Sequence, residues 1–171
     1  MAHNSVVSTD KDIAVHLSPV WRQKANFLIH AELSSVGLPS KWEQLWVRQL
    51  DGGRYELCCI PFFAPGLALA DQVDVAPKNG MEHVVRSLVA DSGRVAARVA
   101  FVNDAEFETL ARQIIDQMRT ANCLFEWYTT RYLAIDIADR RAFQHMNKVL
   151  ADHGSAGNIK YEFSKQGVFE H

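Results

Sequence analysis

Residues 94–120 read RVAARVAFVNDAEFETLARQIIDQMRT, and this stretch decides the class of the fold. Up to Val102, apolar side chains alternate with arginine or alanine, a period of two that predicts a strand. Asn103 and Glu106 then form a capping box, which predicts that a helix begins there. The helix carries one continuous apolar stripe, formed by Phe107, Leu110, Ala111, Ile114, Ile115 and Met118.

The rest of the C-terminal half repeats this order of elements. Residues 124–129 and 131–138 are short and rich in aromatic and β-branched side chains, which predicts two strands. Asp139 caps a second predicted helix, with Gly154 at its C-terminal cap, and residues 159–163 alternate as a last strand. The order β-α-β-β-α-β predicts a ferredoxin-like sandwich, with two helices on one face of a four-stranded sheet.

The N-terminal half shows only strand patterns. Residues 24–33 alternate between apolar and polar side chains, and residues 42–50 and 54–60 flank Asp51-Gly52-Gly53, a strong hairpin signal. Residues 71–75 predict a further strand. The half therefore predicts a small, curved antiparallel sheet or barrel.

The chain divides into three predicted parts. Residues 1–20 are polar and predict a flexible tail, residues 21–90 a β-rich N-terminal subdomain, and residues 91–171 the ferredoxin-like C-terminal subdomain. Residues 82–90 suit either a helix or a strand, and the turn signal after them favours a strand. The fold class is α+β.

Composition limits the possible functions. Apolar residues make up 48% of the 171 residues and charged residues 22%, as in an ordinary globular protein. The net charge of -2 argues against a nucleic-acid partner, because such binders carry a basic excess. Residues 131–136 lack the glycine and the second aromatic of an RNA-recognition strand. No apolar run is long enough to span a membrane and no signal peptide precedes the first strand, so we expect no membrane partner and a cytoplasmic location.

The sequence offers no catalytic motif and no cofactor or metal site. Cys58, Cys59 and Cys123 have no ligand spacing, and we expect them to be reduced and structural. His145 and His153 would lie about 12 Å apart along a helix, too far for one ion. We interpret Asp71 and Asp74 as solvated charges in a loop rather than as a general acid–base pair. Asp136 and Asp139 are no better candidates for such a pair, because Asp139 already caps a helix. Accordingly no residue is predicted to be catalytic, and no cofactor is expected.

One face of the predicted C-terminal sheet has the composition of an interface. The side chains that point away from the helices combine two tyrosines with charges of both signs. The alternatives are that this face packs on the N-terminal sheet or meets water. The candidate partner-binding residues are Arg94, Arg98, Glu126, Tyr128, Tyr132, Asp136, Lys160 and Glu162.

The N-terminal half also carries a family resemblance. The pieces Glu43-Gln44-Leu45-Trp46-Val47, Tyr55-Glu56-Leu57 and Ile60-Pro61-Phe62-Phe63-Ala64, followed by Gly66-Leu67-Ala68-Leu69-Ala70-Asp71-Gln72-Val73, resemble a bacterial family of unknown function. The distinctive part is Ile-Pro-Phe-Phe-Ala-x-Gly-x-Ala-x-x-Asp-x-Val. Family members usually have glycine where this chain has Ala70. The resemblance implies no activity, and Pro61, Phe62 and Phe63 are expected to form a bulge with two core aromatics.

Three hypotheses about function remain open. The preferred one is a non-enzymatic binding protein, specifically a bacterial immunity protein that neutralises a cognate toxin by direct binding, by analogy with other small α+β proteins. The second is a module that senses a small ligand. The third is an enzyme whose site lies between the two halves, which would require convergent titratable groups in a cleft.

Overall fold

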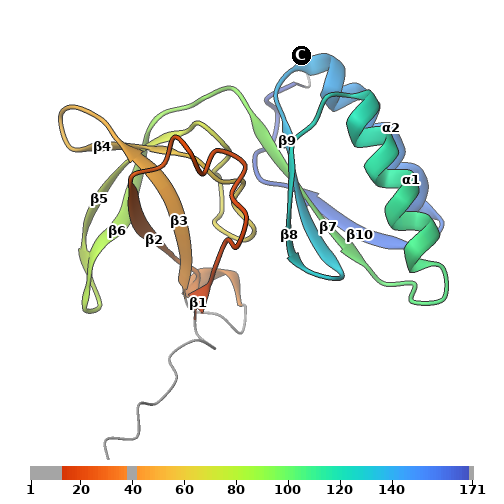
Figure 1. Cartoon of the computed structure of the whole chain (residues 1–171), viewed down its shortest axis with the longest axis horizontal. Helices are drawn as coiled ribbons and strands as arrows, with labels where there is room; N and C mark the ends of the chain where they lie inside the picture. The colour runs from red at the N-terminus through yellow and green to blue at the C-terminus, as the bar shows by residue number, and fades with distance from the viewer. Residues whose placement is uncertain (1–12, 38–41, 170–171) are drawn as a thin grey trace, which may run out of the picture.

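The computed structural model describes residues 13–37 and 42–169, and it is an α+β structure with a six-stranded and a four-stranded sheet (Figure 1). Its elements are β1 (Ile13–Ala14), β2 (Phe27–Glu32), a 3-10 turn (Ser34–Val36), β3 (Trp42–Gln49), β4 (Arg54–Leu57), β5 (Gln72–Lys78), β6 (Met81–Ala90), β7 (Val95–Phe101), α1 (Phe107–Thr120), β8 (Phe125–Thr129), β9 (Tyr132–Ile137), α2 (Arg140–Ser155) and β10 (Ile159–Phe163).

The N-terminal sheet closes on itself as a small barrel. Its strand order is β1-β3-β2-β6-β5-β4, and β3 also pairs with β4. All of these pairs are antiparallel except β1 with β3 and β2 with β6. The enclosed core holds Ile29, Leu45, Val47, Leu57 and Val73, all completely buried. The chain reverses between β3 and β4 at Gly52 and Gly53, both with the positive φ that glycine tolerates.

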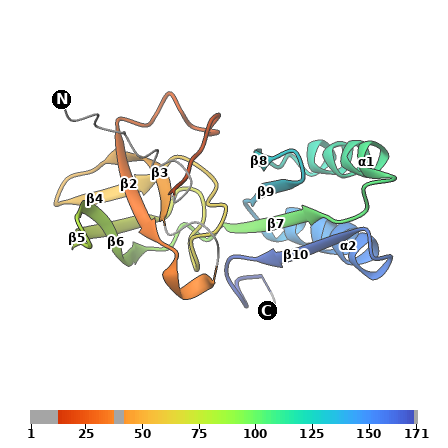
Figure 2. The same cartoon turned by 90° about the horizontal axis from the view of Figure 1, so that it is seen from below.

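The C-terminal half is a layer of two helices on one face of the second sheet (Figure 2). The elements follow the predicted order β7-α1-β8-β9-α2-β10, and the antiparallel strand order is β10-β7-β9-β8. The predicted stripe of α1 packs on this sheet, with Ile114 and Met118 completely buried. Residues 81–90 form a strand, as the turn signal predicted.

The predicted first residue is correct for α2 but not for α1. Asp139 caps α2 as expected, because its side chain accepts a hydrogen bond from the backbone N–H of Ala142. The predicted capping box at Asn103 is wrong, since α1 begins only at Phe107 and its N-cap residue, Glu106, makes no side-chain capping bond. The Asn103 side chain instead donates to Asn158, across the connection to β10.

The prediction for the C-terminal end of α2 is also wrong. Gly154 lies inside the helix, where a Cβ atom would come within 2.9 Å of the Tyr161 ring. The left-handed conformation is taken by Gly157, with a φ of 76°. Close packing against β10, rather than capping, therefore accounts for glycine at position 154.

Within the predicted flexible tail, residues 1–20, the described residues 13–20 are held in the fold. Residues 1–12 lie outside the described part of the chain, but Ile13 and Ala14 already pair with β3. His16 is buried. The prediction extended the polar character of residues 1–12 to residues 13–20, which are mostly apolar and include His16, whose charged partners lie inside the molecule.

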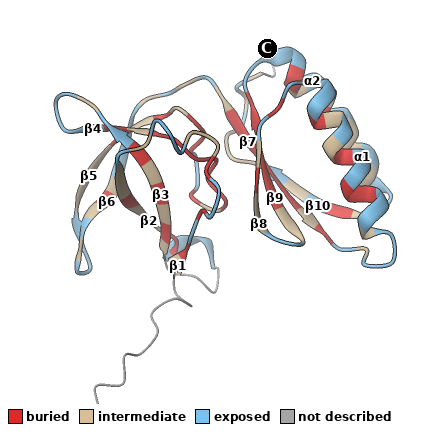
Figure 3. Cartoon of the chain, viewed as in Figure 1, coloured by how far each residue is buried: buried red, intermediate tan, exposed pale blue. Residues whose placement is uncertain are grey.

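The two halves meet through the face of the C-terminal sheet that the helices leave open. Ala96 of β7 and Ala134 of β9 pack there against Ile60, Phe62 and Leu69, which belong to the segment between β4 and β5. Figure 3 shows buried residues on both sides of this junction. The middle of the predicted interface face is thus covered from within the chain.

Candidate functional site

A buried histidine joins the two halves. Nδ1 of His16 lies 2.8 Å from a carboxylate oxygen of Glu126 on β8, and Nε2 lies 2.9 Å from a carboxylate oxygen of Glu43 on β3. The side chains of His16 and Glu43 are 0% exposed and that of Glu126 is 2% exposed. His16 therefore connects the barrel to the four-stranded sheet inside the protein.

Both carboxylates also bind the backbone of the loop that follows β4. Glu43 accepts hydrogen bonds from the N–H groups of Phe62, Phe63 and Ala64, at 2.6, 3.0 and 2.7 Å. Glu126 accepts one from Ile60 at 2.5 Å. A carboxylate that accepts several N–H bonds is stabilised in its charged form even when it is buried.

Side chains of the C-terminal half bind the carbonyl groups of the same loop. The Arg98 guanidinium donates to the carbonyl oxygens of Pro61 and Ala64, and the Tyr132 hydroxyl donates to that of Phe62 at 2.7 Å. The loop 60–64, which was expected to form a bulge with two core aromatics, is thus held on both of its polar sides. These contacts satisfy backbone groups that would otherwise be buried without partners.

The charges of this cluster depend on each other. Burial by itself lowers the pKa of His16, but its neighbours Cys59, Glu126 and Glu43 outweigh burial, and the pKa lies well above its ordinary value. Burial raises the pKa of Glu43, but the hydrogen bond and charge of His16, with the loop amides, leave that pKa below its ordinary value. The cluster is therefore an imidazolium between two carboxylates.

The residue types of this cluster would suit catalysis, but their burial does not. His16 and Cys59 lie together with two glutamates, a combination found around cysteine nucleophiles. Burial raises the pKa of the Cys59 thiol, which keeps it protonated and unreactive. With all of these side chains closed to solvent, the geometry supports a role in holding the halves together.

A second cluster of charges, formed by Lys165, Asp71 and Asp91, holds the segment after β10 in place. Nζ of Lys165 lies 2.9 Å from Asp71 and 2.7 Å from Asp91. Asp71 also accepts hydrogen bonds from the N–H groups of Ala68 and Ser92. Asp71 is completely buried, so its reading as a solvated charge is wrong. Asp74 does not belong to this cluster. It accepts hydrogen bonds from Arg86 and Ser87, and these bonds, mainly those from Arg86, lower the pKa of its carboxyl group to about 2.

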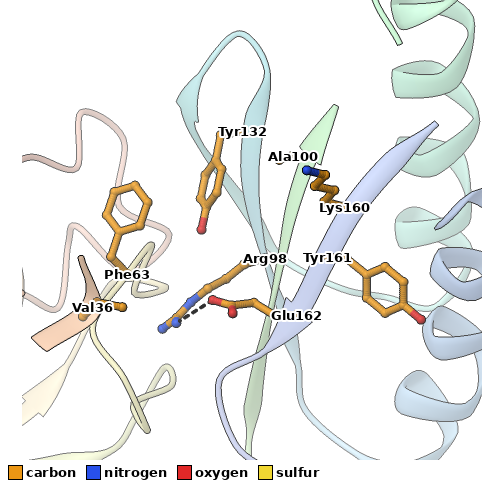
Figure 4. A pocket seen from close by; sticks show the side chains of 8 residues that line it. All are labelled: Val36, Phe63, Arg98, Ala100, Tyr132, Lys160, Tyr161 and Glu162. Carbon is orange, nitrogen blue, oxygen red and sulfur yellow. Dashed lines mark hydrogen bonds and ion pairs between the residues drawn. The ribbon is translucent and has the colours of Figure 1, made fainter. Parts of the chain in front are cut away.

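A groove lies beside the loop 60–64, on the part of the sheet face that the barrel leaves uncovered (Figure 4). Its volume is about 310 Å³. Phe63 and Tyr132 stand on one side, and Arg98 and Glu162 face each other across its floor. Lys160 is exposed at its other end. Val36 of the 3-10 turn lines the barrel side.

The predicted partner-binding residues fall into two groups. The first group, Arg98, Glu126 and Asp136, is buried. Arg98 and Glu126 form hydrogen bonds with the loop 60–64 of the N-terminal half. Lys160 and Glu162 are exposed and line the groove. The two groups adjoin each other, because Arg98 of the first forms an ion pair with Glu162 of the second.

The remaining predicted residues are Tyr128, Tyr132 and Arg94. Tyr128 and Tyr132 pack on Phe63, with ring centroids 4.9 and 5.1 Å away. Arg94 forms an ion pair with Asp136, one of whose carboxylate oxygens has no hydrogen-bond partner among the described residues. Burial raises the pKa of Asp136 to about 6 despite Arg94.

The sequence prediction missed His16 and Glu43. A signal for Glu43 was present, because it shares the inward face of β3 with Leu45 and Val47, where an acidic residue is unusual. His16 had none, since it is a single histidine in a short segment without periodicity. Its role depends on partners 27 and 110 residues away.

Three further observations concern chemistry and location. The cysteines are free and buried. Within the described ranges, no group of three or more His, Cys, Asp or Glu side chains is placed to hold a metal ion. Neither helix of the described chain is both long and apolar enough to cross a membrane.

Comparisons with known proteins give a family and a fold. The model of the domain of unknown function DUF4265 matches residues 43–161. A solved structure described as "Novel crystal structure of a hypothetical protein from Neisseria gonorrhoeae" is similar, with a TM-score of 0.67 and 16% identity, over 79% of this chain and 91% of that one. At this identity the likeness shows the fold alone. No curated protein matches. Because the family model spans more than half of the sequence, this chain belongs to the DUF4265 family.

Proposed function

We propose that this protein is a non-enzymatic binding protein whose partner site is the groove beside the loop 60–64. The observation that carries the proposal is the pair of exposed charges, Lys160 and Glu162, next to the aromatic side chains of Phe63 and Tyr132. Aromatic side chains flanked by charges of both signs are typical of protein interfaces.

The rigidity of the groove supports the proposal. Phe63 is held through its backbone N–H by Glu43, and Tyr132 through its hydroxyl by the carbonyl oxygen of Phe62. Arg98 is held by two loop carbonyl groups and is only 5% exposed. A surface fixed in this way loses little conformational entropy when a partner binds.

The finer architecture proposed for the C-terminal half is a ferredoxin-like sandwich. Its support is the element order β7-α1-β8-β9-α2-β10 together with the strand order β10-β7-β9-β8. In this architecture the face opposite the helices is free for contacts. Here the barrel takes one part of that face and leaves the groove as the other.

The partner that we propose is a protein, specifically a toxin neutralised in the cytoplasm of a bacterium by this chain acting as its immunity protein. The Glu162 side chain is 65% exposed, and the oppositely charged Lys160 is also exposed. Together they suit a protein segment that carries charges of both signs. The assignment to immunity proteins rests on analogy with small α+β proteins of that class.

The experiment tests the groove and the partner together. The product of the neighbouring gene is purified, and its affinity for the wild-type chain is measured by calorimetry. The double charge reversal Lys160→Glu with Glu162→Lys is expected to weaken a complex by roughly tenfold or more. The matched control is Lys148→Glu with Asp152→Lys, an exposed ion pair on α2, on the other side of the sheet.

Two results would overturn the proposal. If no complex forms with that protein, the immunity hypothesis fails. If a complex forms but both reversals weaken it equally, the groove is not its site.

The volume of the groove favours one second candidate, a module that senses a small ligand. About 310 Å³ lies at the lower end of the range for small-molecule sites. A thermal-shift screen of metabolites tests it. A ligand whose stabilising effect is lost in Lys160→Glu would favour this candidate over a protein partner.

A further inference from the structure

The hydrogen bonds around His16 fix its charge. A carboxylate can only accept hydrogen bonds, and both ring nitrogens of His16 face carboxylate oxygens, at 2.8 and 2.9 Å. The other hydrogen bonds of Glu43 and Glu126 come from backbone N–H groups, and such donors favour the charged form of both carboxyl groups. Both ring nitrogens must therefore donate, and only the doubly protonated ring can do so.

The ring of Phe62 gives independent support for this charge. It lies parallel to the imidazole, with the centroids 4.1 Å apart and an angle of 7° between the planes. A cation over an aromatic face is stabilised by the negative charge density of that face, most strongly where water is excluded. Phe62 thus favours the protonated form of His16.

We propose that His16 is a permanent cation at neutral pH that fastens segment 13–20 to both halves, and that loss of its proton releases the loop 60–64 and with it the groove wall. The release follows from the donors that a neutral ring retains. It is uncharged and has one N–H group, so both buried carboxylates would lose their counter-charge and one of them would also lose its hydrogen-bond donor. Naming this wall as part of a partner site rests on the proposed function.

The loop 60–64 depends on Glu43, and therefore on the charge of His16. Glu43 holds Phe62, Phe63 and Ala64 through their N–H groups. Without the imidazolium, its buried charge is uncompensated, and water must enter or the carboxylate must turn away. Either change breaks the bonds that position Phe63 in the groove.

Deprotonation acts on the alkaline side. The titratable groups that face His16 are Glu43 from β3, Glu126 from β8 and the thiol of Cys59 from the segment after β4. Because the pKa of His16 is raised on folding, its contribution to stability is complete below about pH 6.5 and is lost as the pH rises through the raised value. Because the pKa of Glu43 is lowered, its contribution is present above about pH 4.5 and is lost in acid.

The decisive experiment is nitrogen-15 NMR of the histidine rings in the wild-type protein. At about pH 8, roughly 97% of an ordinary histidine is neutral. We expect His16 to retain protons on both nitrogens at that pH, with both resonances at imidazolium shifts. A neutral tautomer of His16 at pH 8 would overturn the proposal.

A second measurement tests the release of the loop. Hydrogen exchange of the Phe62, Phe63 and Ala64 amides is followed from pH 7 to the pH at which His16 loses its proton. Beyond the general acceleration by base, these amides should exchange at least tenfold faster once His16 is neutral. The control amide is that of Ala142, which binds the Asp139 carboxylate far from His16. If the loop amides and Ala142 accelerate in parallel, there is no release.

A conservative variant separates charge from packing. Glu126→Gln removes one of the two negative partners and should lower the proton affinity of His16 at least tenfold, whereas Glu162→Gln, which is exposed, should not change it. If Glu126→Gln does not fold, the wild-type titration still decides the outcome. None of these measurements uses a partner, so the failure of this proposal and the failure of the groove as a binding site can be told apart.

Discussion

The hydroxyl of Tyr132 donates a 2.7 Å hydrogen bond to the carbonyl oxygen of Phe62, and this bond joins β9 of the C-terminal sheet to the loop of the barrel half. Burial raises the pKa of Tyr132, so the hydroxyl remains a donor at all ordinary pH values. Tyr132→Phe leaves the buried carbonyl group without this donor and should lower the free energy of unfolding by about 1–3 kcal/mol.

Chemical denaturation of Tyr132→Phe measures this loss. Tyr161→Phe is the matched control, because the Tyr161 hydroxyl forms no hydrogen bond with any residue that the structure describes, and it should change stability by less than about 0.5 kcal/mol. Equal effects of the two variants would show that the Tyr132 hydroxyl does not hold the loop.

Ala70 has a φ of 65°, a left-handed conformation in which a side chain is strained. Glycine adopts this conformation without strain, so Ala70→Gly should raise the free energy of unfolding by about 0.5–1 kcal/mol, or about 1–4 °C in the melting temperature. Ala68→Gly is the control and should lower the free energy of unfolding, since Ala68 is completely buried and its backbone is not left-handed. Calorimetry in which Ala70→Gly melts below the wild type would refute the strain.

Asp136 makes stability depend on pH in the opposite sense to most carboxyl groups. Burial raises its pKa from 3.8 to about 6, so its contribution to stability is present below pH 3.8 and is lost as the pH rises through 6. Asp136→Asn removes this titration. Relative to the variant, the wild type should therefore lose roughly 2 kcal/mol between pH 4.5 and pH 7.5.

Urea unfolding at about pH 4.5 and pH 7.5 measures this difference. Asp116→Asn on α1, where the side chain is 62% exposed, provides the control and should change stability by less than about 0.5 kcal/mol at either pH. Parallel pH profiles of the wild type and Asp136→Asn would contradict the raised pKa.

Lys165 is the cation of the second buried charge cluster, and its side chain is only 7% exposed. Lys165→Met leaves the buried carboxylate of Asp71 without its counter-charge and should cost about 3–5 kcal/mol. The same change at Lys148, whose ion pair with Asp152 is exposed, should leave the free energy of unfolding almost unchanged. Thermal melts of both variants provide the comparison, and a Lys165→Met protein as stable as Lys148→Met would show that the cluster is not stabilising.

The sequence was informative where side chains repeat with a period. The apolar stripe of α1 and the alternation from Arg94 to Val102 record which side of each element is buried, so element order and fold class could be predicted. The alternation also placed Tyr132 and Asp136 on one side of the sheet, which is correct. It could not tell what covers that side, because the covering loop 60–64 lies far away in the sequence.

The buried charges could not be predicted for a related reason. Glu126 alternates correctly with its neighbours, but whether a glutamate meets water or a histidine depends on His16, which lies 110 residues earlier. A single polar residue in an aperiodic segment leaves no local trace of such a pairing. The family resemblance did mark the segment from Ile60 to Val73. The structure shows that this segment contributes to the contacts between the halves, because the Ile60 N–H donates to Glu126 and Asp71 accepts from the Ser92 N–H and from Lys165.

The bond between His16 and Glu126 has a consequence for the way in which the chain is made. At about 5–20 residues per second, a ribosome needs roughly 5–20 s to travel from His16 to Glu126. The barrel strands up to β6, β1 included, can pair in that interval, but His16 must wait for its second carboxylate partner, which has not been synthesised. His16 therefore completes its contacts only after the strands of the barrel can pair, and a nascent chain halted before Glu126 would leave Nδ1 of His16 without its carboxylate partner.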